Sequence, residues 1–78
     1  MITVRFFAAA REAAGTDQAQ FDCASVADLH EQLAGRFGAR MSQVLAASSL
    51  LCAGTRLGDD DELPDRSELD VLPPFAGG

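Results

Sequence analysis

The residues best suited to chemistry lie at the end of the chain, which closes on Gly77 and Gly78. Glycine makes up about 7% of residues in ordinary proteins, so a chance pair at this place has odds of about 0.5%. Because glycine has no side chain, an extended segment ending in it can enter a narrow channel and reach a buried active site. We therefore expect the chemistry to occur on the α-carboxylate of Gly78.

Two prolines precede this segment and set its stiffness. Proline fixes the backbone angle φ and favours an extended chain, which holds a tail away from the domain that carries it. The sequence predicts a folded domain over residues 1–72 and an extended tail over residues 73–78. The residues expected to thread into a partner with this tail are Pro73, Pro74, Phe75, Ala76, Gly77 and Gly78.

Side chains suited to catalysis are scarce in the rest of the chain. His30 is the only histidine, and helical spacing places it beside apolar residues, which favours a place at the boundary of a packing face. Lysine is absent, so no lysine side chain can form a Schiff base with a substrate. The sequence also has no glycine-rich loop between a strand and a helix that could bind a phosphate. Cys23 and Cys52 are too few for a zinc site and are predicted to be small buried hydrophobic residues. The folded part of the chain therefore offers little support for an enzyme, and we expect no metal and no bound cofactor.

Charge narrows the choice of partner. Six arginines stand against twelve acidic residues, which gives a net charge of −6. Such a surface repels phosphate backbones and anionic lipids, so we expect no nucleic acid and no membrane partner, and favour a protein with a basic face. The acidic run 59–62 is interpreted as a solvated loop, since it lacks the ligand spacing of a calcium loop. The start of the chain lacks the features of a signal peptide, so a cytoplasmic location is expected.

Hydrophobic periodicity predicts the elements that position the tail. Ile2, Val4 and Phe6 alternate with residues of the other face, as in a strand. Ser25 and Asp28 have the spacing of a capping box at the start of a helix. The predicted order is a strand (1–7), a helical turn or loop (8–15), a weaker strand (17–23), a helix from Ser25 to the stop at Gly38, a short helix (39–47), a short buried strand (49–53) and a last strand (68–72).

This order of elements predicts an α+β roll. The first two strands form an antiparallel pair, and after a helical crossover the last strand lies parallel to the first, with the helix on one face. Strand parity then turns Phe7 and Leu72 together toward the uncovered face and makes Arg5 and Asp70 a plausible pair. Large apolar residues on an open sheet face are typical of a binding patch, so Phe7 and Leu72 are predicted to bind the partner.

From its first residue to its last, the chain resembles a known family, the small sulfur-carrier subunit of molybdopterin synthase, which has a ubiquitin-like β-grasp fold. The residues that carry the resemblance are Val4-Arg5-Phe6-Phe7-Ala8, Arg11-Glu12, Gly15, Ser25-Val26, Leu29, Leu33 and Leu72-Pro73-Pro74-Phe75-Ala76-Gly77-Gly78. One departure is the turn after the third strand, where the family often has Val-Asn and this chain has Cys52-Ala53-Gly54.

The resemblance implies a mixed β-grasp sheet with one main helix packed on one face. It also implies two partners: an ATP-dependent enzyme that adenylates Gly78 and replaces AMP by sulfur, and the large synthase subunit. The resulting thiocarboxylate would donate its sulfur to a cyclic pyranopterin precursor. ATP would be used by the activating enzyme, and the catalytic acid and base groups would lie on the large subunit.

Three alternatives stay open at the level of sequence. The first is a sulfur carrier of the same fold for thiamin-thiazole synthesis. The second is a ubiquitin-like modifier attached to target lysines, although the lack of lysine excludes chains linked through its own side chains. The third is an adaptor whose final glycines have no function.

Overall fold

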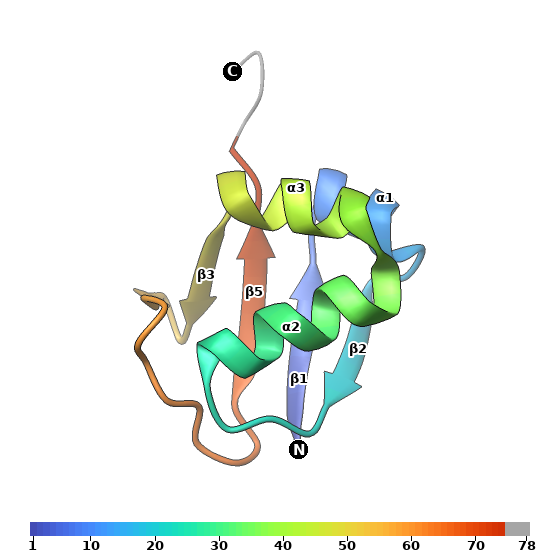
Figure 1. The fold of residues 1–78 in the computed structure, drawn as a ribbon. Coiled ribbons are helices and arrows are strands. Elements are labelled where there is room, and N and C mark those ends of the chain that lie inside the picture. Colours follow the sequence, from blue (N-terminus) through green and yellow to red (C-terminus); the bar gives the residue numbers. More distant parts are fainter. Residues whose placement is uncertain (75–78) are drawn as a thin grey trace.

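A five-stranded mixed sheet with helices packed on one side forms the body of the molecule (Figure 1). A computed structural model describes residues 1–74 of the 78. The elements in chain order are β1 (Ile2–Phe6), α1 (Ala9–Ala14), β2 (Gln18–Phe21), α2 (Val26–Phe37), α3 (Ala39–Ala47), β3 (Ser49–Cys52), β4 (Thr55–Arg56) and β5 (Glu68–Leu72). The predicted α+β roll is confirmed.

The two central strands come from opposite ends of the sequence. The strand order is β2-β1-β5-β3-β4, and β1 and β5 pair in parallel, with Val4 opposite Leu69 and Phe6 opposite Val71. β2 and β3 flank this pair on either side and run antiparallel to their neighbours. The expected parallel pairing of the first and last strands, reached after a helical crossover, is therefore observed.

The main helix forms where its capping signals lie. The Ser25 hydroxyl accepts a hydrogen bond from the backbone N–H of Asp28 at 3.1 Å, which satisfies one of the free donors at the start of α2. Gly38 ends the helix with a φ of 88°, a conformation that favours glycine. α2 lies across the sheet, while α1 and α3 contact each other near the end at which β5 finishes (Figure 1).

One hydrophobic core lies between the sheet and the helices. Alternate residues of β1 and β5 are buried, as expected for strands with one covered face. Phe6 and Phe37 meet edge to face with ring centroids 5.6 Å apart, and the Arg36 guanidinium lies 4.2 Å from the centre of the Phe21 ring. The buried members of the core are Ile2, Val4, Phe6, Ala10, Phe21, Val26, Leu29, Leu33, Met41, Leu45, Leu50, Leu63, Leu69 and Val71.

The structure corrects two local predictions. The strand β3 was expected to be buried, but within it only Leu50 is, because Ser49 and Leu51 pair with Leu72 and Asp70 on the face that no helix covers. Cys23 and Cys52 are half-buried where full burial was expected, since Cys23 follows the end of β2 and Cys52 ends β3. The segment 8–15 contains a true helix, α1, which ends at the left-handed Gly15.

The turn between β3 and β4 supplies a stability prediction. Ala53 and Gly54 have φ values of 51° and 81° and link the paired residues Cys52 and Thr55. A two-residue hairpin turn with both φ values positive favours Asn-Gly, because asparagine tolerates this conformation better than alanine. We expect Ala53→Asn to raise the free energy of unfolding by about 0.5–1 kcal/mol, measured by urea denaturation.

The matched control is Ala24→Asn at an exposed loop position without a positive φ. It should change stability by less than about 0.5 kcal/mol in either direction. Equal effects of the two substitutions would contradict the assignment of strain to Ala53.

Candidate functional site

The tail leaves the domain from the end of its central strand. β5 ends at Leu72, and the next residue, Pro73, is buried while Pro74 is exposed. The other predicted tail residues, Phe75, Ala76, Gly77 and Gly78, lie outside the described residues. Leu72 pairs with Ser49 of β3, and Val71 pairs with Phe6 of β1, so strands on both sides hold the base of the tail. Figure 1 shows this exit beside α1 and α3, at the end opposite Met1.

One face of the sheet is not covered by helices, and we call it the open face. Cross-strand register places these residues on it: Thr3, Arg5, Gln18, Gln20, Ser49, Leu51, Arg56, Glu68, Asp70 and Leu72. Phe7 is 41% exposed, while its neighbour Phe6 is buried. Leu72 is half-buried, while Val71 is buried. The expected facing is confirmed for Leu72, and the exposure of Phe7 agrees with the expectation; the role of both residues in binding remains a prediction.

An ion pair crosses the open face beside these apolar residues. Arg5 donates from Nε to Oδ1 of Asp70 at 2.6 Å and from Nη2 to Oδ2 at 3.2 Å. The hydrogen bond to Asp70, followed by the charge of that carboxylate, raises the pKa of Arg5 above its ordinary value. The pairing expected from strand parity is thus observed, in a bidentate form.

A sharp turn holds Phe7 at the edge of the open face. Ala8 has φ 51° and ψ −123°, a backbone conformation that costs a residue other than glycine about 1–3 kcal/mol. The carbonyl of Phe7 accepts a hydrogen bond from the N–H of Ala10 at 3.0 Å, at the start of α1. The chain therefore turns directly after Phe7, one residue beyond Phe6, which pairs with Val71 next to the start of the tail.

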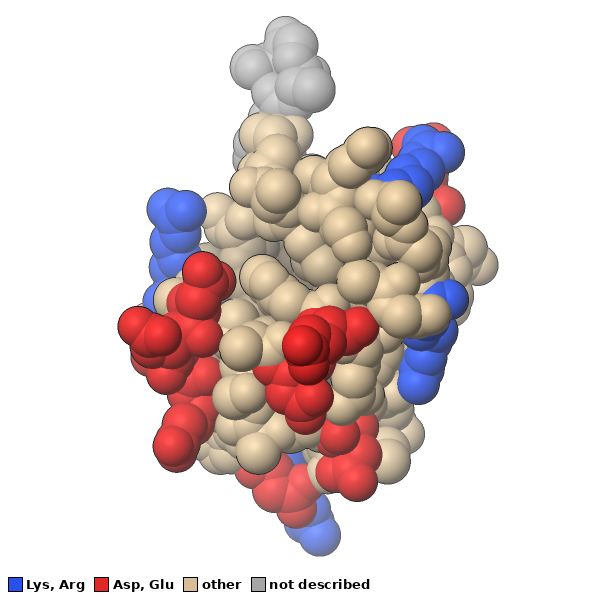
Figure 2. All heavy atoms as spheres, in the orientation of Figure 1, with Lys and Arg blue, Asp and Glu red and all other residues tan. Residues whose placement is uncertain are grey.

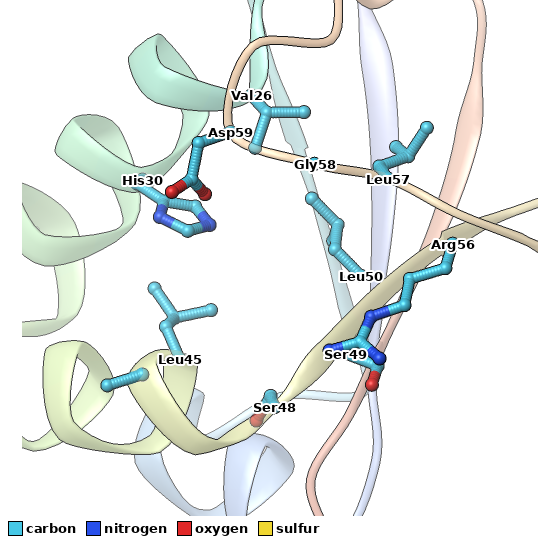
Figure 3. A pocket seen from close by; sticks show the side chains of 11 residues that line it. Val26, His30, Leu45, Ser48, Ser49, Leu50, Arg56, Leu57, Gly58 and Asp59 are labelled. Atoms are coloured by element: carbon cyan, nitrogen blue, oxygen red, sulfur yellow. The ribbon is translucent and has the colours of Figure 1, made fainter.

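A cavity of about 450 Å³ lies between α2, α3 and the β3–β4 edge of the sheet, and Ser49 and Arg56 of the open face also line it. Figure 3 shows His30 entering it from α2 and Asp59 from the loop after β4. Val26, Leu45 and Leu50 contribute buried apolar surface, and no cysteine lines it. His30 is half-buried, as expected for a boundary residue. Within residues 1–74, no group of three or more His, Cys, Asp or Glu side chains is placed to hold a metal ion.

Both cysteines lie away from the tail exit. Cys52 pairs with Leu69, three positions before Leu72, and Cys23 lies beyond the opposite end of the sheet, where Phe21 pairs with Ile2. Burial raises the pKa of the Cys23 thiol, and the charges of Asp28 and Asp22 raise it further. A raised pKa lowers the fraction of thiolate, which is the nucleophilic form.

For a sulfur carrier of the kind that the sequence resembles, we expect the double variant Cys23→Ser/Cys52→Ser to be loaded with sulfur as the wild type is, at a stability cost of about 1 kcal/mol. Mass spectrometry of the protein after incubation with its activating enzyme measures the loading, and circular dichroism checks the fold. A folded double variant that takes up no sulfur would instead indicate a persulfide relay through one of the cysteines.

The sheet order, the parallel central pair and the helix across one face define the β-grasp, or ubiquitin-like, class of proteins, here with a tail leaving the last central strand. The chain belongs to the ThiS family, whose model matches residues 4–78. It is a sulfur carrier of the ubiquitin fold.

Solved structures of the same fold support this assignment. The chain is 26% identical to a putative molybdopterin converting factor, subunit 1, from Pyrococcus furiosus, with a TM-score of 0.83 over 95% of this chain and 97% of that one. It is also 26% identical to the small archaeal modifier protein 1 of Methanosarcina acetivorans, with a TM-score of 0.84 over 99% and 95% of the two chains. A third structure, SAMP1 of Haloferax volcanii, is 25% identical to the chain, with a TM-score of 0.79 over 99% of this chain and 98% of that one. A search of curated proteins gave no significant match.

Within residues 1–74, no helix is long and apolar enough to cross a membrane.

Proposed function

We propose that this protein is the small, sulfur-carrying subunit of molybdopterin synthase. The observation that carries the proposal is the place of the tail: it leaves a central strand held on both sides, next to the exposed Phe7 and the half-buried Leu72. A partner that binds the open face beside this exit would also direct the tail into its own active site. The match to the Pyrococcus furiosus converting factor favours the molybdopterin branch.

The first step would activate the carboxylate of Gly78. A free carboxylate is a poor electrophile, because its leaving group would be an oxide. An ATP-dependent enzyme would transfer AMP to the carboxylate and release pyrophosphate, which gives a mixed anhydride. A sulfur donor would then attack the acyl carbon, and AMP would leave with the electrons of the broken C–O bond. The product is a thiocarboxylate on Gly78.

The second step would transfer the sulfur within a complex with the large subunit. The tail would enter the large subunit, and the terminal sulfur would pass to the cyclic pyranopterin precursor. Hydrolysis would return the carboxylate, so that the carrier can be loaded again. Two transfers would supply the two sulfurs of the dithiolene.

The catalytic acids and bases would belong to the large subunit. In the described part of the chain, the side chains around the exit are apolar or small: Phe7, Ser49, Leu72 and Pro74. Such surroundings suit docking and passage of a chain, not proton transfer. This chain would bind no cofactor itself, would act in the cytoplasm, and would meet ATP only on the activating enzyme.

A second candidate is a protein modifier, favoured by the likeness to the small archaeal modifier proteins. The same adenylated tail would then be attacked by a lysine amine of a target instead of a sulfur donor. A thiazole-forming sulfur carrier differs only in the partner that receives the sulfur. All three share the activation step, so the partner and the product distinguish them.

The test is the intact mass of the protein purified from cells that also contain its activating enzyme. Replacement of oxygen by sulfur on Gly78 adds a fixed mass that fragmentation assigns to the last residue. The loaded protein is then mixed with the molybdopterin synthase large subunit and the pterin precursor, and molybdopterin is measured. Failure to form molybdopterin, with transfer to a thiazole synthase or with adducts on lysines of other proteins, would overturn the proposal.

A further inference from the structure

The open face is organised in rows that run across the strands. The row nearest the tail contains Leu72 and Ser49, and the exposed Phe7 directly follows the end of β1, where Phe6 pairs with Val71. The next row contains Gln18, Arg5, Asp70, Leu51 and Arg56, each paired with the one before it in the register of the sheet. Along a strand, residues two positions apart are about 7 Å apart, so this is also the distance between the rows.

The second row differs in charge from the molecule as a whole. It holds two arginines and one carboxylate in a protein of net charge −6. Many of the acidic residues lie elsewhere: the run 59–62 follows β4, and Asp28 and Glu31 are on α2. Figure 2 shows acidic groups along one edge and the lower end of the helix-covered side. The charge that a partner meets at the open face is therefore not the charge that composition suggests.

The ion pair in this row leaves hydrogen-bond donors available to a partner. A guanidinium has five N–H donors, and in the described structure the two bonds of Arg5 both go to Asp70. Each carboxylate oxygen of Asp70 accepts one of them. The side chain of Arg5 is 47% exposed and that of Asp70 is 26% exposed, so Arg5 is the more accessible member.

The pair contributes little to holding the strands together. Exposed ion pairs give on average little stability, because water screens them and ordering two side chains costs entropy. β1 and β5 are already joined by a backbone ladder from Thr3 to Phe6, with a buried core beneath it. A stabilising role alone does not account for a bidentate pair placed beside the exposed Phe7.

We propose that Arg5, held in place by Asp70, selects the partner that receives the tail. This rests on the proposed function, since it concerns the same docking face. The partner that fits has an apolar surface against Phe7 and Leu72 and, about 7 Å from it, a carboxylate that accepts from the free donors of Arg5. A wholly apolar surface would bury those donors without acceptors, which costs binding free energy and rejects the wrong partner.

The experiment compares binding of charge-swapped variants to the large subunit by calorimetry. The swap Arg5→Asp/Asp70→Arg keeps an ion pair but moves the guanidinium to the neighbouring strand, by about 4.8 Å. We expect at least a tenfold rise in Kd. The matched control is Arg66→Gln, which removes an exposed guanidinium from the loop before β5, at the Met1 end of the sheet, and should change Kd by less than about twofold.

A second variant keeps the test decisive if the swap fails to fold. Arg5→Gln removes the guanidinium without adding charge; we expect a rise in Kd of about fivefold and a flatter salt dependence between about 50 and 300 mM NaCl. Wild-type affinity in the folded swap, or an unchanged Kd and salt dependence in Arg5→Gln, overturns the inference. If the wild type itself does not bind the large subunit, the proposed function fails, and this inference fails with it.

Discussion

Removal of Gly78 is expected to abolish sulfur transfer completely while leaving the domain as stable as the wild type. The acyl carbon that would be adenylated belongs to this residue, so its loss moves the reactive group one residue back, about 3.5 Å short of its target. The buried core lies entirely within residues 2–71, so the free energy of unfolding should change by less than about 0.5 kcal/mol. Molybdopterin formation with the large subunit and a thermal melt measure the two effects.

The matched variant adds one alanine after Gly78. It keeps every native residue but moves the carboxylate outward and places a side chain beside it, so it should be equally inactive and equally stable. An adaptor without tail chemistry would work normally in both forms. Normal molybdopterin formation by either variant would therefore rule out the carrier mechanism.

Phe7→Ala is expected to weaken binding of the partner, whereas Phe6→Ala is expected to destabilise the fold. Phe7 is exposed on the open face, and its loss should weaken binding to the large subunit by about 1–3 kcal/mol, as for an apolar anchor at the centre of an interface. Phe6 is buried and packs edge to face on Phe37, so its truncation should cost about 3–5 kcal/mol of folding free energy. Calorimetric titration and thermal melts of both variants measure these effects.

Each phenylalanine serves as the control for the other, because the two substitutions remove the same atoms from adjacent positions. Phe7→Ala should melt within a few degrees of the wild type, and the folded fraction of Phe6→Ala should bind with nearly normal affinity. If Phe7→Ala binds as tightly as the wild type, the open face is not the docking surface, whatever the activity of the tail.

Much of the fold could be predicted because its signals are local and repeated. The alternation of Ile2, Val4 and Phe6 gave both the strand and its buried face, and Ser25 and Gly38 marked the ends of the main helix. The pairing of Arg5 with Asp70 followed from parity once the two strands were placed in parallel. These inferences depend on backbone periodicity, which is independent of the details of packing.

The remaining features depend on contacts that no local pattern encodes. β4 has only two residues, both exposed, so no alternation could reveal it. Cys52 is half-buried because it ends β3 next to the exposed turn that leads to β4, whereas its residue type alone predicted full burial. The burial of Pro73 and the unusual backbone of Ala8 arise where the chain leaves the sheet, and both define the surroundings of the tail.

The central pairing of β1 with β5 also affects how the domain is made. Arg5 and Asp70, which face each other in this pair, are 65 residues apart in the chain. Before residues 68–72 have been synthesised, β1 with β2 and β3 with β4 can form only isolated two-stranded units, which are marginal in water. Prematurely terminated chains that lack β5 would leave one edge of β1 unpaired, lose Leu69 and Val71 from the core, and be exposed to proteases. Synthesis therefore completes the central strand before residues 73–78, so a chain that carries these residues also carries every strand of the described sheet.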